Sequence, residues 1–112
     1  MPKPAIIAVV GYTGGVGTCL LNAMKKINLQ PYALVRSTTM KINDSEQPVD
    51  YTQLGNVVLE VAKKQGGVPI IADVTASDLV QTYYKEWLSM GISVCTANKG
   101  IFAGRLRLFY KR

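Results

Sequence analysis

Histidine is missing from the sequence, and cysteine is rare. The absence of histidine argues against His-based zinc sites, Ser–His–Asp triads and histidine general bases, so no metal site is expected. The two cysteines, Cys19 and Cys95, lie in apolar contexts without a CxxC spacing. We expect both to be small buried hydrophobic residues in a reducing compartment, and neither a disulfide nor a metal pair.

Long apolar runs are also lacking. No run approaches the roughly 18–20 residues that are needed to cross a membrane. The chain opens "MPKPAIIAVV", so an apolar segment begins almost at the first residue, with no room for a cleavable leader before it. We therefore expect a cytoplasmic protein without a membrane partner.

The charge is unbalanced, with 13 basic and 7 acidic residues and a net charge of +6. Four basic residues crowd the last eight positions, which are residues 105–112. Nucleic-acid binding is the usual hypothesis for such a balance. The sequence has no helix-turn-helix pattern, aromatic stacking motif or continuous basic face, so we do not expect a nucleic-acid partner. A basic surface also suits a phosphorylated cofactor.

Apolar runs and amphipathic stretches alternate along the 112 residues. Residues 5–10, 32–36, 68–74 and 92–97 read as strands. Helical spacing follows the first three of them, over 16–27, over 54–62, and from Ser77 to Gly91. The apolar stripe of 16–27 consists of Val16, Cys19, Leu20, Ala23, Met24 and Ile27. The polar segment 37–51 between the second strand and the second helix reads as a long mobile loop. This order predicts an α/β fold, a Rossmann-like doubly wound parallel sheet that is incomplete, with about four strands.

A glycine-rich turn, "GYTGGVG", joins the first strand to the first helix. Backbone amides can approach a phosphate where side chains are absent, and the positive end of the helix adds to the attraction. The spacing is G-x-x-G-x-x-G, with Thr13 where a strict G-x-G-x-x-G would have its second glycine. The turn predicts a dinucleotide pyrophosphate site, and no GK[ST] is present for a P-loop. Its candidate residues are Gly11, Thr13, Gly14, Gly15, Val16 and Gly17.

The second strand ends in Arg36, followed by Ser37. An acidic residue there would hold the ribose hydroxyls of NAD. A guanidinium beside hydroxyls suits a 2′-phosphate instead, which favours NADP, with NAD as the alternative. Arg36 could also be an ordinary solvated surface residue.

The third and fourth strands end in small polar residues and a lysine, namely Thr75, Ala76, Ser77, Asn98 and Lys99. Ligands of parallel sheets bind at the carboxyl ends of the strands, so these residues should face the cofactor crevice. Lys99 could hydrogen-bond a substrate hydroxyl, or carry a proton if burial lowers its pKa.

Residues 70–104, "IIADVTASDLVQTYYKEWLSMGISVCTANKGIFAG", resemble the homoserine dehydrogenase family, in a segment that runs from a D-x-T-[AS]-S strand end to an [AP]-N-K strand end. The resemblance implies hydride transfer between NADP(H) and homoserine or aspartate semialdehyde, in the biosynthesis of threonine and methionine. It also implies that Thr75 and Ser77 line the cofactor, that Asn98 positions nicotinamide or substrate, and that Lys99 is catalytic. A hydroxy amino acid or its aldehyde would then be the small-molecule partner of the complete enzyme.

Two features depart from that family. The glycine turn looks more like the G-x-[TS]-G-x-[VI]-G turn of aspartate-semialdehyde dehydrogenases, whose nucleophilic cysteine has no counterpart here. The tail "RLRLFYKR" does not resemble the family's continuation. We therefore predict a dinucleotide-binding domain over 1–104 and a divergent basic tail over 105–112, a fragment that binds the cofactor without turnover. The alternative is a non-catalytic binding or regulatory module that self-associates through an exposed sheet edge.

Overall fold

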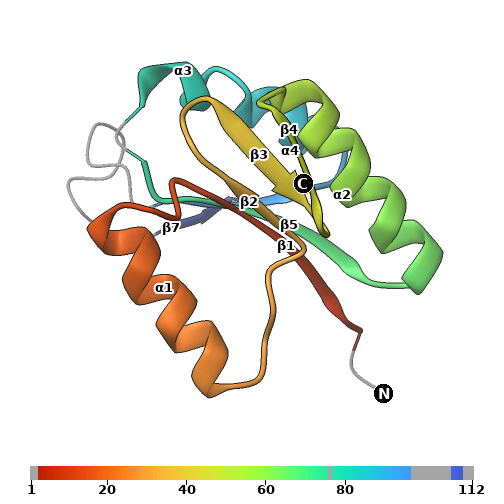
Figure 1. Ribbon diagram of the computed structural model, residues 1–112. Coiled ribbons are helices and arrows are strands. Elements are labelled where there is room, and N and C mark those ends of the chain that lie inside the picture. Colours follow the sequence, from red (N-terminus) through yellow and green to blue (C-terminus); the bar gives the residue numbers. More distant parts are fainter. Residues whose placement is uncertain (1–2, 76, 97–106, 110–112) are drawn as a thin grey trace.

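The computed structural model describes residues 3–75, 77–96 and 107–109 (Figure 1). Four parallel strands form the centre of its sheet, and they are the four that the sequence predicts. β1 (Ala5–Val10) pairs with β2 (Ala33–Val35) on one side and with β5 (Val68–Asp73) on the other. β5 in turn pairs with β6 (Ser93–Thr96). The predicted α/β class with a Rossmann-like parallel core is confirmed.

The sheet is larger than predicted, because three antiparallel strands extend it to seven within the described residues. They are β3 (Thr39–Ile42), β4 (Ser45–Pro48) and β7 (Arg107–Phe109), and the strand order is β4-β3-β2-β1-β5-β6-β7. The prediction of a long mobile loop over 37–51 was therefore wrong. Asn43 and Asp44 form the two-residue turn of a β-hairpin, with Asn43 at φ 57°.

Helices cover both faces of the sheet (Figure 1). α1 (Gly15–Lys26) packs against Ile7 and Val9 through Met24, whereas α2 (Tyr51–Gln65) lies on the opposite face, over Ile6, Ala8 and Val10. β1 thus alternates its side chains between two buried faces, as a central strand does. None of the described helices is long and apolar enough to cross a membrane.

The predicted apolar stripe of α1 is right at Leu20 and Met24, which pack in the core cluster of Ile7 and Val9, and wrong at its other four positions. The exposed four are Val16, Cys19, Ala23 and Ile27, with Ile27 71% accessible. Cys19 is therefore not the buried hydrophobe that we expected, although both cysteines are free thiols. The stripe was predicted too wide, because apolar residues extend round more of the helix than the side that packs against the sheet.

The predicted helix from Ser77 to Gly91 is divided into α3 (Asp78–Gln81) and α4 (Tyr84–Ser89). Ser77 caps α3, since its Oγ accepts from the N–H of Val80 at 3.4 Å. At the break, the Thr82 hydroxyl donates to the carbonyl of Leu79 at 2.6 Å. Such a side-chain bond competes with the helical ladder. Trp87 of α4 is fully buried and Tyr84 is nearly so, so the aromatic side chains of this helix belong to the core.

Candidate functional site

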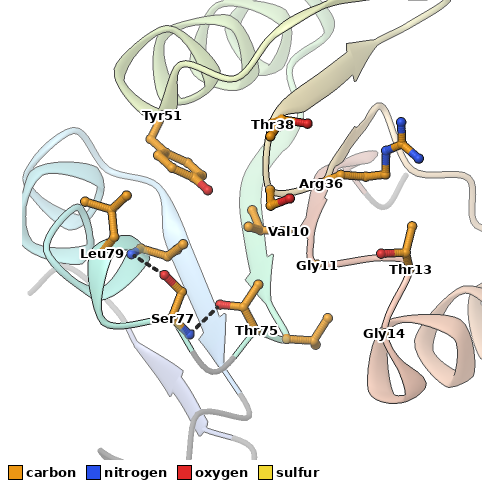
Figure 2. A pocket seen from close by; sticks show the side chains of 13 residues that line it. Val10, Gly11, Thr13, Gly14, Arg36, Thr38, Tyr51, Thr75, Ser77 and Leu79 are labelled. Atoms are coloured by element: carbon orange, nitrogen blue, oxygen red, sulfur yellow. Dashed lines mark hydrogen bonds between the residues drawn. The ribbon is translucent and has the colours of Figure 1, made fainter.

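A pocket of about 840 Å³ lies at the carboxyl ends of β1, β2 and β5 (Figure 2). The chain passes from β1 to β2 on one side and then returns to β5 on the other, so this is the point where the strand order reverses. Ligands of open α/β sheets bind in such a crevice. The volume falls in the range of small-molecule sites. The pocket is lined by Val10, Gly11, Thr13, Gly14, Arg36, Ser37, Thr38, Tyr51, Val74, Thr75, Ser77, Leu79 and Val80.

Gly11 lies where the end of β1 approaches the loop after β5, and both segments line the pocket. Its φ of +89° belongs to the region that glycine adopts without strain, and its N–H donates to the carbonyl of Val35 at 2.8 Å. A Cβ at this position would lie 2.5 Å from Cγ2 of Thr75. The end of β1 and the loop after β5 can therefore approach each other only because residue 11 has no side chain.

Gly17 holds the helix against the same turn. A Cβ there would lie 2.3 Å from the carbonyl oxygen of Gly11 and 2.6 Å from Cα of Tyr12. Around Gly15, by contrast, a Cβ would meet nothing within 4 Å. Gly17 is thus required by packing, whereas no atom of the described residues requires a glycine at position 15. Open space at the start of a helix leaves room for a ligand to approach the backbone.

The N-terminus of α1 offers donors to an anion. Gly14 is the N-cap, so no side chain caps the helix, and its first turn contains no acidic residue. The N–H of Thr18 is the first to bond within the helix, to the carbonyl of Gly14 at 2.9 Å. The N–H groups before it have no intrahelical acceptor, and the helix dipole favours negative charge there. These features suit a phosphate group.

Arg36, on the loop after β2, supplies the charge of the pocket. Its side chain lies on the same side of the pocket as Thr13 (Figure 2). Its guanidinium is exposed, with Nη2 4.0 Å from Oε1 of Glu46 and Nε 3.4 Å from the hydroxyl of Thr39. No carboxylate belongs to the described lining, and no cluster of three or more metal-ligating side chains occurs in the described part of the chain. An anionic ligand therefore meets one cation and no opposing acid among the lining side chains.

A buried carboxylate shapes the wall of the pocket that follows β5. Asp73 is fully buried and accepts from the backbone N–H of Thr75 at 2.9 Å and from its hydroxyl at 2.6 Å. The Tyr84 hydroxyl also donates to Asp73 and lies 3.0 Å from Oγ1 of Thr96. Burial, and then this bond to Asp73, raise the pKa of Tyr84 well above its usual value near 10. Tyr84 therefore remains a neutral donor that ties the ends of β5 and β6 together.

The two hydroxyls of this wall differ in what they can do for a ligand. The Thr75 hydroxyl proton goes to Asp73, and its oxygen accepts from the N–H of Ser77 at 3.2 Å. The Ser77 oxygen accepts from Val80, but its own proton has no acceptor among the described residues. Ser77 can thus donate to a ligand, whereas Thr75 acts as scaffold.

Seven of the predicted site residues meet in this pocket: Gly11, Thr13, Gly14, Arg36, Ser37, Thr75 and Ser77. Gly15, Val16 and Gly17 lie beside it, in the first turn of α1. Ala76, Asn98 and Lys99 lie outside the described residues, so their predicted roles stay predictions. Thr38, the second of the hydroxyls expected beside Arg36, lines the pocket too. Sequence reasoning missed Tyr51, Leu79 and the supporting Asp73, although a lone carboxylate at the end of the apolar run "VPIIAD" was a usable signal.

The sequence profile described as "Homoserine dehydrogenase, NAD binding domain" matches residues 11–111. The chain belongs to this family. The match covers the glycine turn, Arg36, both polar strand ends and nearly all of the tail, so the homoserine dehydrogenase resemblance of residues 70–104 is confirmed and extended. No curated protein sequence matches the chain. The family assigns a nicotinamide dinucleotide to the chain. The glycine-rich turn and the guanidinium of Arg36, the one cation of the described lining, fit such a cofactor.

Proposed function

We propose that this homoserine dehydrogenase-type domain binds NADP(H) in preference to NAD(H). The observation that carries the proposal is the composition of one pocket, in which the glycine turn at the start of α1 and the guanidinium of Arg36 lie on the same side. The glycine turn matches the pyrophosphate of NADP, and the guanidinium matches its 2′-phosphate.

The preference depends on the rim that follows β2. NAD-specific Rossmann sites place an acidic residue near the end of the second strand, where it accepts from the ribose hydroxyls. Here the corresponding residues are Arg36, Ser37 and Thr38, and all three line the pocket. A guanidinium offers paired donors to phosphate oxygens and compensates their charge, and the neighbouring hydroxyls can add bonds.

Within the family, the bound cofactor supplies or accepts a hydride. We propose that the other reactant is the pair homoserine and aspartate semialdehyde, as the sequence resemblance implies. Lys99 is the residue that we assign to the substrate hydroxyl, because it follows shortly after the end of β6 in the sequence. Ser77 is the hydroxyl that we assign to the cofactor, because it donates to no acceptor among the described residues.

Titration of the chain with NADPH and, separately, with NADH tests the preference, with cofactor fluorescence as the signal. Saturable binding of NADPH, at least about tenfold tighter than that of NADH, is the expected result, since each tenfold corresponds to about 1.4 kcal/mol. No saturable signal up to millimolar NADPH would contradict the proposal.

Arg36→Gln should weaken NADPH binding by about 10- to 100-fold, because a hydrogen bond to a charged group contributes about 1.5–3 kcal/mol. NADH binding should change little. Lys41→Gln is the matched control, because it removes the same charge from an exposed residue of β3 that does not line the pocket. Equal losses in the two variants would show that net charge, and not Arg36 itself, governs the affinity.

A further inference from the structure

Tyr51 places a hydroxyl inside the pocket from a direction that the glycine turn and the strand ends do not supply. It is the first residue of α2, after the N-cap Asp50, whose carboxylate accepts from the N–H of Gln53 at 3.0 Å. Figure 2 shows the ring reaching into the pocket with its hydroxyl toward the interior. Among the described residues, no side chain or backbone group makes a hydrogen bond to that hydroxyl within the protein.

The ring of Tyr51 is held in place before any ligand arrives. It lies 5.2 Å from the ring of Tyr83 and 6.4 Å from that of the fully buried Trp87, measured between centroids. The indole N–H of Trp87 also donates to the backbone carbonyl of Tyr51 at 3.1 Å. A hydroxyl on such a fixed ring loses little conformational freedom when it binds a ligand.

The pocket is polarised between its two sides. Arg36 and Thr13 lie on one side, and Tyr51 and Leu79 lie on the other (Figure 2). Ser77 lies on the side of Leu79 as well, so that side offers the Tyr51 ring and the Leu79 side chain, with the hydroxyls of Tyr51 and Ser77 as polar groups (Figure 2). Val10 and Val80 also belong to the apolar lining of the pocket. A nucleotide has the same polarity, with phosphates at one end and a flat base that carries a few polar ring atoms at the other.

We infer that Tyr51 determines specificity for the adenine base, with its hydroxyl hydrogen-bonding to the base while the aliphatic side chains pack against the ring faces. The inference deepens the proposed dinucleotide binding and depends on it. Burial, followed by the negative charge of Asp73 and by Tyr83, raises the pKa of Tyr51 above its usual value near 10. The hydroxyl therefore stays protonated, and its contribution should be constant between about pH 6 and 9.

Tyr51→Phe tests the inference with two ligands, NADPH and 2′-phospho-ADP-ribose, which lacks the nicotinamide but keeps the adenosine. Both ligands should bind about 3- to 10-fold more weakly to the variant, because a neutral hydrogen bond is removed from the part that they share. Tyr83→Phe is the matched control. It deletes a hydroxyl from the neighbouring ring, which does not line the pocket, and should leave both affinities unchanged.

The outcomes separate this inference from the proposal on which it depends. If the unmodified chain binds neither ligand, the proposed function is wrong and the role of Tyr51 falls with it. If the unmodified chain binds both and Tyr51→Phe binds them equally well, only the role of Tyr51 is wrong. A loss confined to NADPH would place Tyr51 at the nicotinamide end and would also overturn the inference. Thermal unfolding of each variant verifies that the fold is retained.

Discussion

Replacement of Gly17 by alanine should destabilise the domain, whereas the same replacement at Gly15 should not. The added Cβ at position 17 would lie 2.3 Å from the Gly11 carbonyl oxygen and 2.6 Å and 2.8 Å from Cα and C of Tyr12. All three contacts are with backbone atoms, which cannot rotate away as the end of a side chain can. The start of α1 must therefore move away from the turn.

The magnitude follows from two opposing terms. Alanine is preferred over glycine within a helix by up to about 1 kcal/mol. Overpacking of a tight contact costs about 1–3 kcal/mol and sometimes more. For Gly17→Ala the second term dominates, and we expect a net loss of about 1–2 kcal/mol or more from the free energy of unfolding. For Gly15→Ala only the first term applies, because nothing lies within 4 Å of the added carbon.

Urea unfolding measures this difference through the fluorescence of Trp87, which is the single tryptophan of the sequence and is fully buried. NADPH binding supplies the second measurement. Gly15→Ala should weaken binding without loss of stability, since its methyl group projects into the space that we assign to the pyrophosphate. A Gly17→Ala chain as stable as the unmodified one would refute the packing argument. Equal stability losses at both positions would refute the distinction between a packing glycine and a ligand glycine.

The remaining predictions concern the wall built on Asp73. Asp73→Ala should lower the free energy of unfolding by more than about 3 kcal/mol, because it leaves three buried donors, two of Thr75 and one of Tyr84, without their acceptor. Asp73→Asn keeps an acceptor and should lower it by less. Urea unfolding measures both variants. Thr75→Val should cost about 1–3 kcal/mol, and Thr75→Ser, which keeps the hydroxyl, should cost less; equal costs would contradict the scaffold role. Because the folded state keeps Tyr84 protonated above the pKa near 10 of the unfolded chain, the contribution of Tyr84 to stability should be constant below pH 10 and fall by up to about 1.4 kcal/mol per pH unit above it. Burial raises the pKa of the Cys95 thiol and of Tyr51 as well, so these two groups add to the loss as the pH rises. Denaturant midpoints from pH 8 to 11 test this, and Tyr84→Phe should reduce the slope above pH 10 without abolishing it.

The centre of the fold could be predicted because its signals are local and strong. β1 is a continuous apolar run with side chains buried on both faces, and Gly11 follows it. β5 is apolar up to Asp73, and its second half is buried. The rule that ligands collect at the carboxyl ends of parallel strands then placed Gly11, Arg36 and Thr75 at one edge. That step required only the strand order, and the pocket brings these residues together.

The hairpin was missed because its strands are short and its outer strand is polar. In β3 only Met40 and Ile42 are buried, and β4 has no buried residue. Four-residue strands with two apolar positions give too little alternation to outweigh Asn43 and Asp44, which read equally well as loop residues or as a tight turn. The sheet edge provided by β2 decides between these alternatives, and it is not visible in the local sequence.

Tyr51 was missed for a related reason. The sequence assigned it to the end of a loop, so nothing indicated that it begins α2 or that the hairpin returns the chain to the pocket. The side chain reaches the site only because β3 and β4 bring Asp50 back beside the end of β2. Residues that join a site through such a return connection can be found only when the pairing of the strands is known.

Asp73 shows a further limit of the motif itself. The pattern D-x-T-[AS]-S placed two hydroxyls beside the cofactor and assigned both to it, because a motif records residue types and not the direction of each proton. In the structure, the Thr75 hydroxyl donates to the buried carboxylate of Asp73, whereas the Ser77 hydroxyl donates to no group of the described residues. A carboxylate with no solvent contact requires such donors, since an unpaired buried charge is costly. In this motif, Thr75 therefore serves to hydrogen-bond the buried Asp73. Ser77 is the hydroxyl that can face the ligand.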